Sequence, residues 1–306
     1  SSSSAPRPTP RATITWSAPT PWAAPGATRC STWVPPGACR PRWPLAWLVI
    51  AAAALWALVP GWFAHQNPVV GQAGQQLLEP GLAHWLGTDA LGRDILSRTI
   101  YGARTSVAFA FVAAFCTMVL GLMLGILSGY FGGWVDYVIM RLADIMLSIP
   151  SLLLAMVVMY TLGQSTVNLF IALSLTSWAS VARVVRSQTL SLKESEYVEA
   201  ARSIGVSNGK IMLKHILPNC IPSLIVLFTL NVPSAILSES SLSFLGIGAQ
   251  PPAASWGLMV NQSKQFLFTQ PWLALAPCIA IMIVVLAFNF LGDGLRDVLD
   301  PYMKNQ

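Results

Sequence analysis

The sequence predicts an all-α protein that crosses a membrane several times, and two observations carry this prediction. First, 54% of its 306 residues are hydrophobic and only 10% are charged, whereas a soluble domain carries roughly 25% charged residues. Second, charged residues are absent from four long stretches, at 105–135, 145–182, 215–238 and 265–292. An ion near the bilayer centre costs roughly 2.5 kcal/mol or more, so each stretch suits helices of about 20 residues in lipid.

The uncharged stretches divide into six expected spans. The stretch after Asp144 is long enough for two helices, with a turn at Gly163, Gln164 and Ser165. An apolar run near the N-terminus adds one more helix. It follows Arg40 and Arg42 and therefore resembles a signal peptide as well, but we favour an uncleaved span. The expected spans are 45–63, 104–128, 138–162, 166–186, 220–242 and 271–291.

Basic residues indicate the orientation of these spans. With both termini in the cytoplasm, fourteen of the 18 Lys and Arg residues fall on the cytoplasmic side, as the positive-inside rule requires. Those fourteen are Arg7, Arg11, Arg29, Arg40, Arg42, Arg141, Arg183, Arg186, Lys193, Arg202, Lys210, Lys214, Arg296 and Lys304. The other four are Arg93, Arg98, Arg104 and Lys264. We therefore interpret the net charge of +6 as a sign of topology. No basic and aromatic stripe suggests that the chain binds nucleic acid.

The parts of the chain outside the spans differ in composition. Residues 1–44 are rich in Pro, Ser, Ala and Arg, contain no acidic residue and show no periodicity, so we expect a disordered tail. Residues 64–103 form a polar extracytoplasmic segment, either a small substructure or a surface helix. Residues 104–292 form a five-helix domain that contains a polar loop at 190–218. Residues 293–306 form a cytoplasmic tail.

The loop at 190–218 is too polar to enter lipid, and its local signals predict two short helices. The first runs from about Leu190 to Ile204 and ends at Gly205, a residue suited to a left-handed conformation. Ser207 can cap the start of a second helix through Leu217. Pro218 either ends that helix or starts the next one.

One face of the first predicted helix is apolar. Tyr197, Ala200, Ala201 and Ile204 follow the i, i+3, i+4, i+7 spacing, and Glu199 lies off that face. Such a helix could lie in a groove of a partner protein, with its acid paired to a cation there. On the pattern alone, an ordinary amphipathic connector is the simpler interpretation.

Two features inside the spans leave alternatives open. Gly121, Gly125 and Gly129 form a doubled G-x-x-x-G pattern, which lets helices approach closely either within this chain or against a partner subunit. Glu239 lies near the outer end of the fifth span, beside serines. A carboxylate there suggests a cavity or an external gate, but hydrogen bonding to the serines explains it equally well.

Several motifs resemble one known family. Glu199-Ala200-Ala201, Gly205 and Ile216-Leu217-Pro218 together resemble the EAA loop of type I ABC importer permeases. Other similar stretches are HWLGTD (84–89), LGRD (91–94), GYFGG (129–133), LSFLG (242–246), GAQPP (248–252), WG (256–257), GDGLRD (292–297) and DP (300–301). The resemblance covers about 45–306 and points to the C-type permease of dipeptide, oligopeptide and nickel importers. It does not extend to the tail.

This resemblance implies a type I permease fold and a set of partners. In that family the EAA loop forms the coupling helices that insert into an ATPase subunit. The expected partners are a homologous B-type permease, two ATPase subunits, an extracytoplasmic solute-binding protein, a peptide solute and the lipid of a bacterial plasma membrane. The resemblance favours peptides over nickel or a metal chelate. The permease would form half of a pathway that works by alternating access.

The sequence contains no G-x-x-x-x-G-K-[ST] phosphate loop, so ATP and Mg²⁺ are expected on the partner ATPases. We therefore expect a transport subunit and not an enzyme, with no metal or other cofactor held by this chain. A self-sufficient ion-coupled transporter is the main alternative, but no internal repeat supports it. An intramembrane enzyme would need HExxH or a nucleophile with its base, and neither pattern is present.

Overall fold

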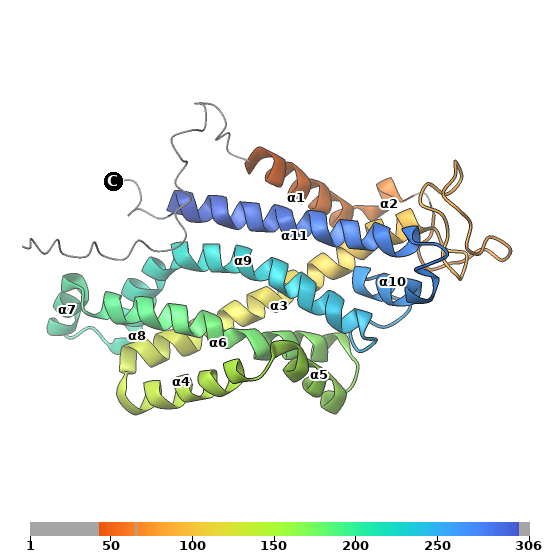
Figure 1. Ribbon diagram of the computed structural model, residues 1–306. Coiled ribbons are helices and arrows are strands. Elements are labelled where there is room, and N and C mark those ends of the chain that lie inside the picture. The colour runs from red at the N-terminus through yellow and green to blue at the C-terminus, as the bar shows by residue number, and fades with distance from the viewer. Residues whose placement is uncertain (1–42, 65, 300–306) are drawn as a thin grey trace, which may run out of the picture. The chain divides into compact units, whose positions relative to one another are not determined.

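The computed structural model describes residues 43–64 and 66–299, and nearly all of its regular structure is helical. Residues 1–42 of the predicted tail and residues 300–306 of the C-terminal tail lie outside this description. The elements, in chain order (Figure 1), are α1 (Trp43–Leu58), α2 (Pro60–Phe63), α3 (Ile95–Phe131), α4 (Gly133–Ser148), α5 (Ser151–Leu162), α6 (Thr166–Lys193), α7 (Glu196–Ser203), α8 (Asn208–Ile211), the π-helix η1 (Met212–Ile216), α9 (Leu217–Phe244), α10 (Trp256–Ser263), the 3₁₀-helix η2 (Lys264–Phe266) and α11 (Trp272–Leu299).

Within the described residues, four helices are long and apolar enough to cross a membrane. They are α3, α6, the continuous stretch Asn208–Phe244 and α11. A fifth span consists of α4 and α5 together, if that bent pair is counted as one. α1, at the first expected span, has 16 residues and is too short to be counted with them, so the described helices give four or five of the six expected spans.

The third expected span, 138–162, is not one straight helix. The axes of α4 and α5 differ by 96°, and the break lies at Ile149 and Pro150. Ile149 has an extended backbone, with φ −97° and ψ 132°. A residue before proline is pushed out of the helical region by the proline ring, which explains why this largely apolar stretch bends here.

α3 and α6 pack closely over much of their length, and glycines permit the close approach. Gly121, Gly125 and Gly129 each face a β-branched residue of α6, so the doubled glycine pattern is used within the chain. A Cβ atom built on the glycine would lie 2.6 Å from the Cβ of Val181, 2.7 Å from that of Val185 and 2.7 Å from that of Thr189, respectively. In lipid, where water does not drive apolar surfaces together, such close packing is a main source of helix association.

Ion pairs hold α4 against α6. Arg186 donates from Nε and Nη2 to the two carboxylate oxygens of Asp136, each at 2.5 Å. Two turns further along α4, Asp144 accepts from Arg183 at 2.5 Å and lies 3.6 Å from Arg141. A bidentate arginine–carboxylate pair fixes geometry as well as charge, so these contacts set the position of the bent pair along α6.

The segment between α2 and α3 is a small hydrogen-bonded substructure, one of the two forms expected for it. His84 joins Asp94 through Nδ1 and Gln75 through Nε2, both at 3.0 Å. Asp94 also caps α3 by accepting from the backbone N–H of Ser97 at 2.8 Å. This cap explains why α3 begins at Ile95, well before the expected start at residue 104.

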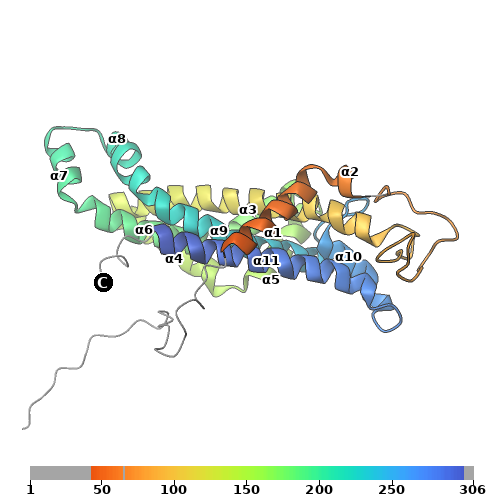
Figure 2. The same ribbon diagram turned by 90° about the horizontal axis from the view of Figure 1, so that it is seen from above.

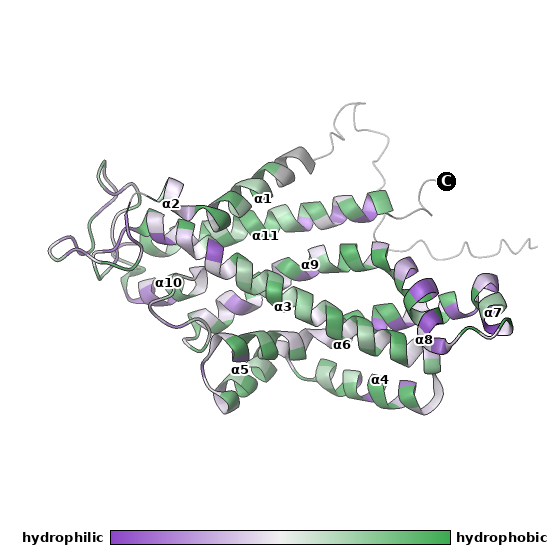
Figure 3. Ribbon diagram, turned by 180° about the vertical axis from the view of Figure 1, so that it is seen from behind, coloured by the Kyte–Doolittle hydropathy of each residue, from purple (hydrophilic) through white to green (hydrophobic). Residues whose placement is uncertain are grey.

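Polar residues concentrate at the two ends of the helices, and apolar residues lie between them (Figure 3). One end, called here the α7 end, carries α7 and α8 (Figures 1 and 2). The opposite end, called the α10 end, carries α10 and the segment before α3. This distribution is that of a protein whose middle lies in hydrocarbon.

Replacing Gly125 with alanine tests the contact between α3 and α6. The new methyl group would lie 2.8 Å from the carbonyl oxygen of Ala182, which is backbone and cannot rotate away. Overpacking of this kind costs about 1–3 kcal/mol, so we expect a lower Tm for the protein in detergent. Gly209→Ala is the matched control, because nothing lies within 4 Å of its added Cβ. An unchanged Tm for Gly125→Ala would contradict the packing described.

Candidate functional site

The predicted docking loop begins where α6 ends. α6 continues to Lys193, so the first loop helix is shorter than expected and runs only over α7. The chain turns between α6 and α7 at Ser195, whose carbonyl accepts from the N–H groups of Val198 and Glu199 at 3.0 and 3.1 Å. Its hydroxyl donates to the Leu192 carbonyl at 2.5 Å. These bonds give the turn a defined shape.

Gly205 ends α7 in the left-handed conformation that the sequence predicts, with φ of 81°. Its N–H donates to the carbonyl of Arg202 at 3.0 Å, and the next N–H, of Val206, donates to Ala201 at 3.1 Å. This pair of bonds is a Schellman motif, which satisfies the last carbonyls of a helix. Open space surrounds the Cα of Gly205 on the side where a side chain would point.

α7 presents a different face to the protein than the periodicity suggests. Of the four predicted apolar residues only Ala201 is buried, and Val198, which was not predicted, is fully buried beside it. Tyr197 and Ile204 are 43% and 81% exposed. The periodicity predicted the helix correctly but not which of its faces is buried, because Val198 packs against residues of α3, α6 and α9 that are distant in the sequence. Glu199 and Ala200 are also exposed, so an apolar surface with an acid beside it faces away from the chain.

The second half of the loop runs directly into a spanning helix. α8, η1 and α9 are continuous from Asn208 to Phe244, so the expected separate second helix is not found. Pro218 lies near the start of α9 and is exposed. Inside an α-helix its ring would clash with the carbonyl four residues earlier, and the wider π turn just before it relieves that contact. Ile216 is buried and Leu217 is half-buried.

Tyr130, at the end of α3, holds the loop in place. Its hydroxyl donates to Oδ1 of Asn208 at 2.8 Å, and its ring is 5% exposed. Two cations lie near that ring, the ammonium of Lys193 at 5.8 Å and the guanidinium of Arg202 at 5.9 Å from the centroid. No local sequence pattern indicates this role of Tyr130, because Asn208 is 78 positions away along the chain.

Glu239 is completely buried in α9, towards the α10 end. It accepts from the hydroxyl of Ser243 at 2.7 Å and from Ser240 at 3.4 Å. The side chains of Ser106 of α3 and Ser255, the N-cap of α10, also lie close to its carboxyl group. The serine hydrogen bonding expected as one alternative is therefore present within α9. The gate remains a prediction.

The predicted site residues thus fall in three separate places. The loop residues lie at the α7 end, the glycines lie within the α3–α6 contact, and Glu239 lies among serines of α3, α9 and α10. This arrangement is that of a polytopic helical membrane subunit with an exposed polar loop at one end. Residues 121–305 of this chain match the model of the family described as "Binding-protein-dependent transport system inner membrane component". The chain belongs to this family.

Relatives with assigned functions agree with this membership. The chain is 45% identical over 243 residues to a dipeptide transport system permease protein of Alkalihalophilus pseudofirmus, covering 79% of this chain and 78% of that one. It is 44% identical over 226 residues to a glutathione transport system permease protein of Pectobacterium atrosepticum, covering 74% and 75%. The corresponding Escherichia coli protein is 47% identical over 225 residues, covering 74% of each.

Solved structures support the fold. The chain superposes on an inward-facing structure of the MetNI methionine ABC transporter with a TM-score of 0.55 and 19% identity. The match covers 67% of this chain and 98% of that one. The fold is therefore that of a type I ABC importer permease, as the sequence motifs predicted.

Removing the hydroxyl of Tyr130 tests its hold on the loop. Tyr130→Phe keeps the ring but loses the bond to Asn208, which is worth about 1 kcal/mol. We expect amide hydrogen exchange across residues 205–211 to rise about fivefold. Tyr160→Phe is the control, because that tyrosine is 87% exposed and lies on α5. Equal exchange in the Tyr130 variant and the wild type would exclude the anchoring role.

Proposed function

We propose that this chain is the permease subunit of an ABC importer for di- and oligopeptides, and that residues Glu199–Pro218 are the docking site for its ATPase. The observation that carries the proposal is the exposed face of α7. Tyr197, Ala200 and Ile204 offer apolar surface to solvent, with Glu199 available to pair with a cation. Exposed apolar surface of this kind commonly marks a protein–protein contact.

Charge supports an orientation with the α7 end in the cytoplasm. Six basic residues lie in this loop or in the last turns of α6 before it (Arg183, Arg186, Lys193, Arg202, Lys210 and Lys214), whereas four lie towards the opposite end (Arg93, Arg98, Arg104 and Lys264). Under the positive-inside rule the richer end faces the cytoplasm, where ATP is available. Both termini would then be cytoplasmic, and the α10 end would face the solute-binding protein.

The mechanism would be alternating access driven by separate ATPase chains. ATP and Mg²⁺ would bind between two ATPase subunits, and their closure would move the docked loop. Because the loop continues into α9, this movement would turn the pathway between this permease and its B-type partner outward. Hydrolysis would return the pathway inward. The free energy enters as a difference in ATP affinity between the two arrangements.

Peptides are the solute class that the relatives favour. Their names specify dipeptide and glutathione transport, and both solutes are short peptides. Neither name refers to nickel or to a metal chelate, the alternative left open by the motifs. The solute-binding protein, a separate chain in this proposal, would supply the main selection among peptides.

Uptake in reconstituted vesicles tests the ATP dependence. The complete importer should accumulate a labelled dipeptide with ATP and lose accumulation when the phosphate-loop lysine of its ATPase is replaced by alanine. Hydrolysis depends on that lysine, which contacts the phosphates. A preparation without the solute-binding protein measures the background. If accumulation persists in the lysine variant, the chain is an ion-coupled transporter instead.

Gly205→Asp tests the docking site. A side chain at this left-handed position strains the end of α7, and its charge enters the docking face. We expect solute-stimulated ATP hydrolysis to fall at least tenfold, while the protein still inserts in the membrane. Gly163→Asp adds the same charge at another glycine with a positive φ, in the turn between α5 and α6 outside the docking site, and should keep most of the activity. Normal coupling in Gly205→Asp would place the docking site elsewhere.

A further inference from the structure

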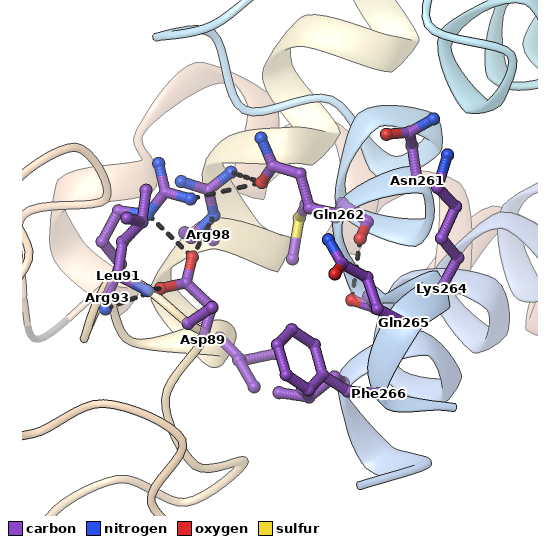
Figure 4. Close-up of a pocket in the computed structure, with 14 residues that line it drawn as sticks. Asp89, Leu91, Arg93, Arg98, Asn261, Gln262, Lys264, Gln265 and Phe266 are labelled. Atoms are coloured by element: carbon purple, nitrogen blue, oxygen red, sulfur yellow. Dashed lines mark hydrogen bonds and ion pairs between the residues drawn. The ribbon is translucent and has the colours of Figure 1, made fainter. Parts of the chain in front are cut away.

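A cavity at the α10 end has features that neither the docking site nor the helix packing explains. It has a volume of about 400 Å³ and lies between residues 89–98 and the α10–η2 segment (Figure 4). Cavities that bind small ligands usually measure about 300–1,000 Å³. Its size is therefore suited to a molecule of a few residues.

The cavity carries an excess of positive charge. Arg93, Arg98 and Lys264 line it together with a single acid, Asp89. Both guanidinium groups are almost withdrawn from solvent, since Arg93 is 7% and Arg98 is 1% exposed. Lys264 is exposed at the rim and forms no ion pair with any residue that the structure describes.

The two arginines carry two positive charges, but only one carboxylate, that of Asp89, lies beside them. Nε of Arg93 donates to Asp89 at 2.7 Å, and Nε of Arg98 lies 3.7 Å from the same carboxylate oxygen. On their other side, Nη2 of each arginine donates to one neutral oxygen, Oε1 of Gln262, at 3.2 Å in both cases. A buried charge is costly unless it is paired. A second carboxylate at this cavity would balance the pair.

The lining also has an apolar part, beside the polar residues Asn261, Ser263 and Gln265. Ile95, Met259, Phe266 and Leu273 lie on the same cavity, beside the charged residues. A ligand with a carboxylate at one end and an apolar side chain next to it would match both parts. A single acidic side chain from a docked protein would fill only the charged part of the 400 Å³ and leave the apolar part empty.

From this arrangement we infer that the cavity binds the C-terminal carboxylate of a short peptide, with the peptide's last side chain against Phe266 and its apolar neighbours. The inference rests on the proposed function, which makes peptides the solute. The cavity is then an external site on the permease itself, distinct from the solute-binding protein. It receives the end of the solute by charge, through Arg93, Arg98 and Lys264.

Binding to the assembled permease–ATPase complex without its solute-binding protein tests this site. The probes are alanyl-phenylalanine and its C-terminal amide, and calorimetry or ligand-observed NMR gives the affinities. Charge-assisted hydrogen bonds are roughly twice as strong as neutral ones. We expect the free acid to bind at least tenfold more tightly than the amide. Equal affinities, or binding of neither probe, would overturn the inference.

The Gln262→Glu substitution tests whether the two arginines themselves bind the peptide carboxylate. Its carboxylate would lie where both arginines already donate and would supply the missing charge, so binding of the free acid should fall at least tenfold. The variant should keep its Tm, because it adds an ion pair. Gln76→Glu is the matched control, since Gln76 is exposed and lines no part of the cavity. An unchanged affinity in Gln262→Glu would contradict the inference.

Lys264→Gln gives a second measure that does not depend on the buried pair. Because Lys264 is exposed, the substitution leaves the fold intact, and we expect about threefold weaker binding of the acid with no change for the amide. Two further measurements separate the possible failures. If Gln262→Glu weakens docking of the solute-binding protein while the peptide never binds, the cavity belongs to that partner and the inference is wrong. ATP-dependent uptake by the wild type tests the proposed function independently.

Discussion

The close approach of α3 and α6 determines where the other parts of this protein lie. It depends on three glycines that leave room for the branched side chains of Val181, Val185 and Thr189. With α6 held there, Asp136 and Asp144 of α4 can reach arginines of α6, and α6 ends beside Tyr130. In a bilayer, lipid competes equally for apolar surface, so the hydrophobic effect does not hold two helices together. The close fit between α3 and α6 stabilises their contact instead.

The two ends of the molecule use polar residues differently. At the α7 end the loop residues Tyr197, Glu199 and Ile204 are exposed, and the protein binds only the inner side of the loop through Val198 and its neighbours. At the α10 end the charges are enclosed, in the His84–Asp94 network and around the cavity. An exposed surface suits a partner that stays bound, and an enclosed one suits a ligand that must be selected and released. The two ends are therefore consistent with coupling at one and solute handling at the other.

Much of the fold followed from the sequence, because the cost of charge in lipid is a local property of each stretch. The charge-free stretches predicted the spanning helices, and the left-handed preference of glycine predicted the end of α7 at Gly205. Features that depend on distant residues were missed. The anchoring by Tyr130, the burial of Val198 and the arginine pair around Gln262 each join segments far apart in the chain. Pro150 was a local signal for the bend between α4 and α5, but the apolar residues on both sides of it led us to predict one continuous span.

The unbroken course of the chain from Asn208 to Phe244 has a mechanical consequence. A helix of 37 residues is about 55 Å long, which exceeds the roughly 30 Å of hydrocarbon that it crosses. A continuous helix of this length converts a tilt at one end into a displacement of the other end. No loop interrupts it between Asn208 and Phe244. This helix can bend at the π turn Met212–Ile216 and, within α9, at Pro222 and Pro233. Glu239 lies in the part of this helix nearest the α10 end, close to Ser106 of α3 and Ser255 of α10, so a movement applied at the loop would displace it relative to those two helices.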